Sequence, residues 1–261
     1  MTELDRISLE LTSRCSKACW FCYNASGPEM AARWDARDVI AFVTDCARNR
    51  IKAVSFGGGE PLEYPELFEV LGALRGLIFR SFTTNGLALD AMMETVVASA
   101  PDKVHVSIHF PGNEVEVARV IRQVRALDDA GVASGINLLV RASQLADATS
   151  CAAQIRAAGI GNDRIVYLPM RGSDTPTPDD LGRVAGSARF QSMSCLMACA
   201  RSPSFVAIGA DRHVAWCSYT RSRRPLEQPT YAALAAALAG LDLAYCAAPR
   251  VARRLPIAGL L

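Results

Sequence analysis

The 261-residue sequence lacks a long hydrophobic run, a strong net charge and a secretory signal. No apolar stretch approaches the roughly 20 residues that a membrane-spanning helix needs, so we expect no membrane segment. The N-terminal residues MTELDRISLELTSRC carry acidic charge and no long apolar run, which favours a cytoplasmic protein. The formal net charge of +2 gives no electrostatic reason to expect nucleic acid as a partner.

Cysteine, in contrast, is abundant, with nine in the chain. In a reducing compartment, clustered cysteines bind metal or do redox chemistry more often than they form disulfides. Cys15, Cys19 and Cys22 stand in the stretch LTSRCSKACWFCYN with the spacing C-x3-C-x2-C. A zinc site would need a fourth ligand from elsewhere, whereas three thiolates on a [4Fe–4S] cluster leave one iron open. The spacing alone also allows three uncoordinated thiols.

Short β-rich runs alternate with longer helical patterns over the first two thirds of the chain. The runs are rich in Val, Ile, Leu, Phe or Tyr and are bounded by Gly, Pro or Asn, which is typical of strands. Strands are expected at residues 6–12, 53–58, 79–85, 103–110, 134–141 and 164–170, and helices at 35–50, 65–77, 89–100, 113–131 and 143–159. Six β-then-α units predict an α/β fold with a parallel sheet, either open or closed into a partial barrel.

The unusual residues gather where these strands end, which is where such folds bind ligands. The cysteines follow the first strand, FGGGEP (56–61) ends the second, TNG ends the third and SIHF ends the fourth. Glycines let a backbone approach a ligand closely, and Glu60 can accept a hydrogen bond from a cationic amine. Taken alone, FGGGEP is also typical of a glycine-rich turn.

The character of the sequence changes after Met170. RGSDTPTPDDLG (171–182) predicts a linker. A hairpin-like stretch, SFVAIGADRHVAWCS (204–218), and an alanine-rich helix, PTYAALAAALAGL (229–241), follow it. We therefore expect two domains, a core at residues 1–172 and a small α+β extension at residues 173–261.

CSKACWFC, with an aromatic residue before its third cysteine, followed by GGGEP and then by TNG, resembles the radical S-adenosylmethionine (radical SAM) superfamily. The resemblance covers roughly residues 5–170 and implies a partial (β/α)6 barrel similar to a TIM barrel. It implies that Cys15, Cys19 and Cys22 ligate three irons of a [4Fe–4S] cluster, and that S-adenosylmethionine (SAM) binds the fourth.

The resemblance also implies a set of SAM contacts. Gly58, Gly59 and Glu60 match the segment that binds the methionyl amine. Phe21 matches the residue that packs on adenine, and Ser107 matches a contact to the ribose or carboxylate. The further contacts implied on the fifth strand are Asn137 and Arg141.

The activity implied is reductive cleavage of SAM to a 5′-deoxyadenosyl radical that abstracts hydrogen from a substrate. A flavodoxin-type or ferredoxin-type protein would supply the electron. The substrate expected is a ribosomal peptide or a natural-product small molecule, and dehydrogenation or epimerisation of a sugar or aminocyclitol is the alternative. We expect no N-terminal leader-binding domain, so a peptide substrate would need a separate recognition partner. A different class of protein stays open: a non-enzymatic iron–sulfur or zinc scaffold.

The remaining cysteines fall into two groups. Cys46 and Cys151 lie in helical patterns and are expected in the core. The second group is Cys195, Cys199, Cys217 and Cys246.

A hairpin between two cysteines of this second group, with a helix before the last, is similar to SPASM and twitch extensions, which implies a second [4Fe–4S] cluster. Arg212 stands where those extensions usually have glycine, and the usual downstream cysteine pairs are missing. The alternative is a hairpin with stray buried thiols.

Three more side chains are candidates for substrate contact. His109 follows Ser107 by two positions on the fourth strand, so both side chains face the same way. A packed, hydrogen-bonded histidine is the alternative. Tyr167 and Arg171, at the end of the sixth strand, are further candidates.

Overall fold

The computed structural model describes residues 4–187, 189–192 and 205–243. These residues belong to two compact units. The first unit contains residues 4–104 and 205–243, and the second contains residues 105–187 and 189–192. The C-terminal hairpin region therefore belongs to the same unit as the cysteine-rich N-terminal region.

Six strands form the sheet of the first unit, in the order β10-β9-β8-β1-β2-β3. β1, β2 and β3 pair in parallel, β8 pairs in parallel with the other side of β1, and β9 and β10 continue antiparallel. The strands are β1 (Arg6–Thr12), β2 (Ala53–Gly58), β3 (Phe79–Thr84), β8 (Val206–Ile208), β9 (His213–Ala215) and β10 (Arg224–Pro225).

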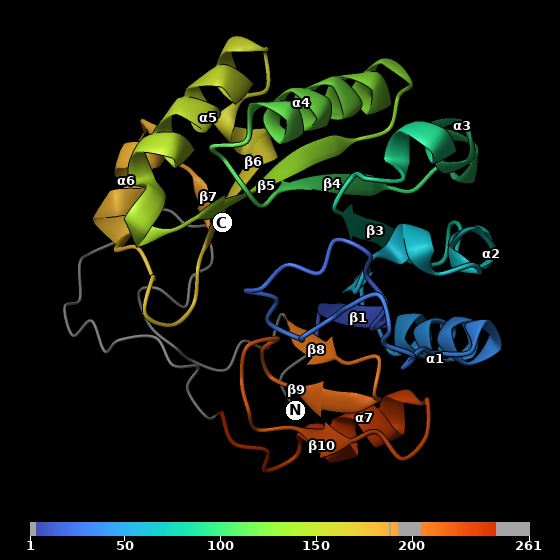
Figure 1. Cartoon of the computed structure of the whole chain (residues 1–261). Coiled ribbons are helices and arrows are strands. Elements are labelled where there is room, and N and C mark those ends of the chain that lie inside the picture. The colour runs from blue at the N-terminus through green and yellow to red at the C-terminus, as the bar shows by residue number, and fades with distance from the viewer. Residues whose placement is uncertain (1–3, 188, 193–204, 244–261) are drawn as a thin grey trace. The chain divides into compact units, whose positions relative to one another are not determined.

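Helices follow the parallel strands of this unit and lie along one side of them (Figure 1). In the first helix, the side chain of Asp35 accepts from the Arg37 N–H at 2.9 Å as an N-cap, and Val39, Phe42 and Val43 are buried. The helices that follow the parallel strands are α1 (Ala36–Arg48), the short 3-10 helix η1 (Pro61–Glu63), α2 (Leu67–Ala73) and α3 (Leu89–Ser99), whereas α7 (Tyr231–Leu238) follows β10.

One face of β1 is buried along the whole strand, and the other face, exposed at Arg6, becomes buried towards the C-terminal end. Ile7 and Leu9 point to one face and are fully buried. Glu10 points to the opposite face and is only 6% exposed, and Thr12, which follows an irregularity in the pairing with β2, is 4% exposed. The strand therefore carries polar groups into a buried environment just before the cysteines.

The second unit contains β-strands and helices in the same alternation. Its strands β5 and β6 pair in parallel, as do β6 and β7. β4 (Lys103–Ile108) runs across the boundary between the units. The other elements are α4 (Glu114–Asp129), β5 (Ser134–Val140), η2 (Ala142–Gln144), α5 (Leu145–Ala157), η3 (Asn162–Arg164), β6 (Ile165–Pro169), α6 (Pro178–Ala185) and β7 (Gln191–Ser192).

The predicted elements agree closely with these bounds, with one correction. The first two strands begin and end where they were predicted, and the C-terminal hairpin and helix are confirmed as β8, β9 and α7. The predicted linker at 171–182 is wrong in its second half, because α6 begins at Pro178. Thr177 and Asp180 form a capping box there, so residues that are typical of turns instead start a helix.

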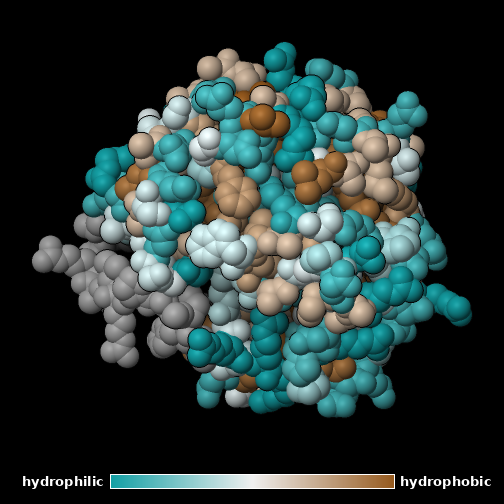
Figure 2. Space-filling model, in the orientation of Figure 1, coloured by the Kyte–Doolittle hydropathy of each residue, from teal (hydrophilic) through white to brown (hydrophobic). Residues whose placement is uncertain are grey.

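No described helix is long and apolar enough to cross a membrane. On the face drawn in Figure 2, hydrophobic residues are interspersed with hydrophilic ones. Of the exposed large hydrophobic side chains in the described residues, three (Trp20, Tyr23 and Met30) lie among residues 13–34.

Candidate functional site

Residues 13–34, here called the cysteine loop, leave the C-terminal end of β1 and return beside it. Ser13 N–H donates to Ala32 O at 2.8 Å, and Trp34 N–H donates to Leu11 O at 3.0 Å. The Trp34 indole N–H donates to Gly209 O at 3.0 Å, so the end of the loop is also tied to the β8–β9 hairpin. The loop is thus closed at its base by the strand and the hairpin.

The three thiols of this loop are half-buried and free of disulfides. A tight turn joins two of them, since Cys22 N–H donates to Cys19 O at 3.0 Å. Burial raises the pKa of the Cys15 thiol, whereas backbone N–H groups of Lys17 and Ala18 act in the opposite direction. Cys15 therefore faces N–H donors that stabilise a thiolate.

The residues present fit an iron–sulfur cluster. No three His, Cys, Asp or Glu side chains within the described ranges lie close enough to hold a single metal ion. A [4Fe–4S] cluster instead places a separate iron on each thiolate. Three thiols on one loop, with backbone N–H groups that hydrogen-bond to the sulfur of Cys15, fit the ligand set of such a cluster.

The glycines after β2 let that strand end lie directly against the cysteine loop. Gly59 N–H donates to Thr12 O at 2.6 Å, and Glu60 N–H donates to Arg14 O at 2.8 Å. A Cβ on Gly59 would overlap Arg14 O. Gly58 has a φ of +108°, and a Cβ there would lie 2.5 Å from Thr12 O. Close backbone approach explains these glycines, and their predicted contact with SAM stays a prediction.

Glu60 lies just after β2 and hydrogen-bonds to Asn85, the residue that follows β3. Its side chain is only 2% exposed, and burial raises its pKa. Oε1 accepts from Leu62 N–H at 3.0 Å, and Oε2 accepts from Asn85 N–H at 2.7 Å. Each carboxylate oxygen can accept a second hydrogen bond, so these contacts do not exhaust its capacity for an ammonium group.

No role was predicted for Asn85, which the structure places between Cys15 and Glu60. Its backbone donates to Glu60, and its side-chain Nδ2 lies 3.7 Å from Cys15 Sγ. The signal was present as the motif TNG at the end of the third strand. The partner of its side chain could not be predicted from the sequence, because Cys15 lies 70 positions away along the chain.

A second cluster of polar side chains lies beside Cys22, and this cluster was also not predicted. Cys22 Sγ lies 2.8 Å from Asn24 Oδ1. The Asn24 and Tyr23 side chains hydrogen-bond to Glu10, and burial raises the Glu10 pKa. The Tyr23 ring contacts the Tyr219 ring, with centroids 5.1 Å apart. Glu10 thus connects β1, the cysteine loop and the C-terminal part of the first unit.

The remaining predicted residues of the first unit are Phe21 and Cys217. Phe21 is half-buried and contacts the Trp20 ring edge-to-face, with centroids 5.2 Å apart. Cys217 is half-buried after β9, and its Sγ accepts from Tyr219 N–H at 3.4 Å. The other predicted auxiliary ligands, Cys195, Cys199 and Cys246, lie outside the described residues.

Several predicted SAM contacts lie on strands of the second unit or just after them. Ser107 is 5% exposed on β4, and Asn137 lies on β5 opposite Val166. Arg141 Nε donates to Asp174 Oδ2 at 2.8 Å. All three roles stay predictions.

The predicted substrate contacts also lie in the second unit. His109 N–H donates to Glu116 Oε1 at 2.6 Å. Tyr167 is fully buried, and its hydroxyl donates to Asn162 Oδ1 at 2.7 Å. Arg171 is half-buried beyond the end of β6. The placement of Tyr167 favours a packing role, and the three substrate contacts stay predictions.

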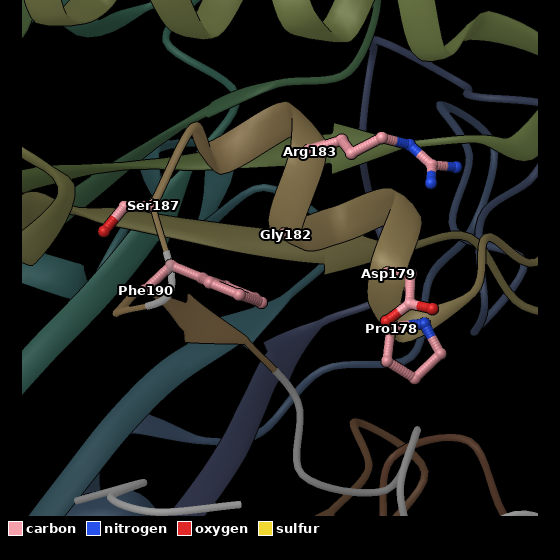
Figure 3. A pocket seen from close by; sticks show the side chains of 6 residues that line it. All are labelled: Pro178, Asp179, Gly182, Arg183, Ser187 and Phe190. Carbon is pink, nitrogen blue, oxygen red and sulfur yellow. The ribbon is translucent and has the colours of Figure 1, made fainter. Parts of the chain in front are cut away.

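Two hollows lie in the described surface. One of about 430 Å³ lies on α6 and contains no predicted site residue. Figure 3 shows the Phe190 ring beside that helix, whose first turn carries Pro178 and Asp179. The other, of about 560 Å³, lies in the first unit and is lined in part by Arg14, Met30 and Glu63. Only the latter borders the cysteine loop.

Comparison with known proteins defines the class. The model of the radical SAM superfamily matches residues 9–170. The chain therefore belongs to the radical SAM superfamily, whose members use a [4Fe–4S] cluster and SAM.

Similar proteins extend this result. The "Probable GTP 3',8-cyclase" of Methanocella arvoryzae is 32% identical over 105 residues, covering 40% of this chain and 34% of that protein. The PqqA peptide cyclase of Gluconobacter oxydans is 26% identical over 175 residues, covering 62% of this chain and 49% of that protein. This chain thus spans half or less of the length of these two relatives.

Solved structures show the fold. Streptococcus suis SuiB bound to S-adenosylmethionine has a TM-score of 0.69 at 15% identity, covering 86% of this chain and 63% of that chain. SuiB has also been solved bound to the precursor peptide SuiA. The predicted fold class is confirmed: an α/β fold of the partial (β/α)6 barrel type with a mostly parallel sheet.

Proposed function

We propose that the chain is an enzyme that holds a [4Fe–4S] cluster on the cysteine loop and uses it to cleave SAM reductively. One observation carries the proposal: the ends of β1, β2 and β3 meet through hydrogen bonds that join the cysteine loop, Glu60 and Asn85. These are the three strand ends at which the sequence motifs lie. Membership of the superfamily over residues 9–170 supports the same assignment.

A cluster held by Cys15, Cys19 and Cys22 would supply the one electron that breaks a carbon–sulfur bond of the SAM sulfonium, so that hydrogen abstraction from the substrate could follow. The protein's part is to bind and orient. Glu60 offers buried carboxylate oxygens to the methionyl ammonium group. Phe21 offers an aromatic face to adenine, and the further contacts proposed are Ser107, Asn137 and Arg141.

The substrate we propose first is a peptide. Two similar proteins support this class by their names, the PqqA peptide cyclase and SuiB with its precursor peptide SuiA. His109, Tyr167 and Arg171 remain the candidate contacts. A flavodoxin-type or ferredoxin-type protein in the cytoplasm would be the reductant.

The C-terminal part is proposed as an extension with an auxiliary [4Fe–4S] cluster, beginning after the predicted boundary at residue 172. The ligands would be Cys217 together with Cys195, Cys199 and Cys246. Support comes from Cys217, whose sulfur is half-buried and accepts a backbone N–H, as cluster sulfurs commonly do.

Anaerobic reconstitution tests the proposed activity. The purified chain is loaded with iron and sulfide, reduced with dithionite and supplied with SAM. We expect release of 5′-deoxyadenosine and methionine, measured by mass spectrometry. Cys19→Ala should abolish the release because it removes one cluster ligand. The matched control is Cys46→Ala, which makes the same substitution at a buried thiol in α1.

The outcomes separate the classes of protein. Release by the wild type and by Cys46→Ala, and none by Cys19→Ala, supports the proposal. A wild-type chain that carries a complete cluster and releases nothing contradicts it and favours an iron–sulfur scaffold.

Iron counting tests the auxiliary cluster separately. In a Cys15/Cys19/Cys22→Ala triple variant the catalytic site is lost. Iron that stays at about four atoms per chain supports the second [4Fe–4S] cluster. Iron near zero, in a variant that keeps the circular dichroism of the wild type, removes it.

A further inference from the structure

Asn85 lies between the two groups that the proposed site needs, a cluster thiol and the Glu60 carboxylate. Its side-chain Nδ2 is 3.7 Å from Cys15 Sγ, and its backbone N–H donates to Glu60 Oε2 at 2.7 Å. The residue is only 5% exposed, so water competes little for the groups that make these two contacts. One residue thus contacts both parts of the site.

The orientation of the Asn85 amide follows from its other partner. Its Oδ1 accepts from Leu87 N–H at 2.8 Å, and an amide oxygen is the only end of the group that can accept. The nitrogen must therefore be the end that faces the Cys15 sulfur. The turn itself is fixed by Gly86, whose N–H donates to Thr84 Oγ1 at 3.0 Å and whose φ is +76°.

Reduction adds an electron to an iron–sulfur cluster and makes it more negative. A hydrogen bond donated to a ligating sulfur stabilises the more negative form, so it raises the reduction potential. Asn24 does not donate to a cysteine sulfur, because it presents its Oδ1, an acceptor, to Cys22. Of these two amides, only Asn85 donates to a thiol of the loop.

We propose that Asn85 is a positioning residue that donates a hydrogen bond to the Cys15 sulfur and raises the reduction potential of the bound cluster. The same residue holds Glu60 in place through its backbone. This inference rests on the proposed function, since it concerns a cluster on the cysteine loop.

The test is an anaerobic redox titration of the reconstituted protein, with the reduced cluster followed by electron paramagnetic resonance. Asn85→Ala removes the donor without adding charge, and we expect its midpoint potential to shift to more negative values. Asn85→Asp keeps an acceptor for Leu87 N–H and the shape of the turn, but replaces the donor by a carboxylate. Its shift should have the same sign and be larger.

Leu87→Ala is the matched control, because Leu87 is a neighbour in the same turn whose side chain is 54% exposed. We expect it to have the midpoint potential of the wild type. If Asn85→Ala does not fold, Asn85→Asp carries the test alone.

Potentials in the Asn85 variants equal to that of the wild type, with equal iron content, would overturn the inference and leave the proposed function standing. A folded wild type that assembles no cluster would overturn the proposed function and the inference with it. A negative shift in the Asn85 variants but not in Leu87→Ala supports the inference, and with it the presence of a cluster on the cysteine loop.

Discussion

Gly59 shows at the scale of one residue how the cysteine loop is held. Its backbone donates to Thr12 O, and a Cβ would overlap the carbonyl oxygen of Arg14. We predict that Gly59→Ala lowers the free energy of unfolding of the apo-protein by about 1–3 kcal/mol, as overpacking does. Urea denaturation followed by circular dichroism measures this change.

Gly57 provides the matched control for that prediction. It lies two positions earlier, and a Cβ there would meet no atom within 4 Å. Gly57→Ala should keep or slightly raise the free energy of unfolding, because alanine restricts the unfolded chain. Equal losses in both variants would contradict the packing argument.

Thiol reactivity separates the site cysteines from the core cysteines. Cys46 and Cys151 are fully buried, and burial raises the pKa of Cys151 to about 12. In the native apo-protein at mildly alkaline pH, we predict that iodoacetamide labels these two at least about tenfold more slowly than the half-buried cysteine-loop thiols. Mass spectrometry of the digested protein measures the labelling, and equal rates would argue against the described core.

The sequence predicted the thiols of the site but not the side chains around them. Cysteine spacing is a local pattern, so Cys15, Cys19 and Cys22 could be proposed as cluster ligands from the sequence alone. Asn85 acts on Cys15 from a different strand end, and Glu10 acts through side chains of the loop. Such contacts depend on which segments meet in space, and spacing along the chain does not reveal that.

At the scale of elements, the strands and helices of the core could be predicted from the sequence because buried β-runs and amphipathic helices alternate regularly. β1 and β2 begin and end as predicted. The hairpin of β8 and β9 was also predicted, but its partner was not, since pairing of β8 with β1 joins segments about 200 residues apart. α6 was missed because its capping residues are also turn residues.

Glu10 makes the burial of β1 testable through pH. Burial raises its pKa above 4.5, so the folded state holds this proton more tightly than the unfolded state does. Its contribution to stability is complete below pH 4.5 and is lost as the pH rises through the folded-state value. We predict that Glu10→Gln gains stability relative to the wild type between pH 4.5 and neutral pH, measured by urea denaturation across that range.

Glu29→Gln is the control for this pH dependence, because Glu29 is an exposed glutamate of the cysteine loop. This variant makes the same substitution at an exposed position, so it shows what the change from Glu to Gln does without burial. A flat difference for Glu10→Gln would show that Glu10 is solvated in the folded state.

At the scale of the whole molecule, the evidence for the family and the evidence for the fold come from different spans of the chain. The superfamily match ends at residue 170, whereas the likeness to SuiB covers 86% of the chain. The β8–β9–β10 strands join the sheet that carries the cysteine loop, so the C-terminal region contributes to the first unit directly. Variants at the base of the hairpin are therefore expected to affect cluster assembly as well as stability.

The central claim is that the cysteine loop holds a cluster with one iron open to SAM. The most direct measurement is the electron paramagnetic resonance spectrum of the reduced, reconstituted protein before and after SAM is added. We predict that SAM changes the spectrum of the wild type, because the added molecule binds the cluster itself. An identical spectrum with and without SAM, from protein that carries a complete cluster, would contradict the account.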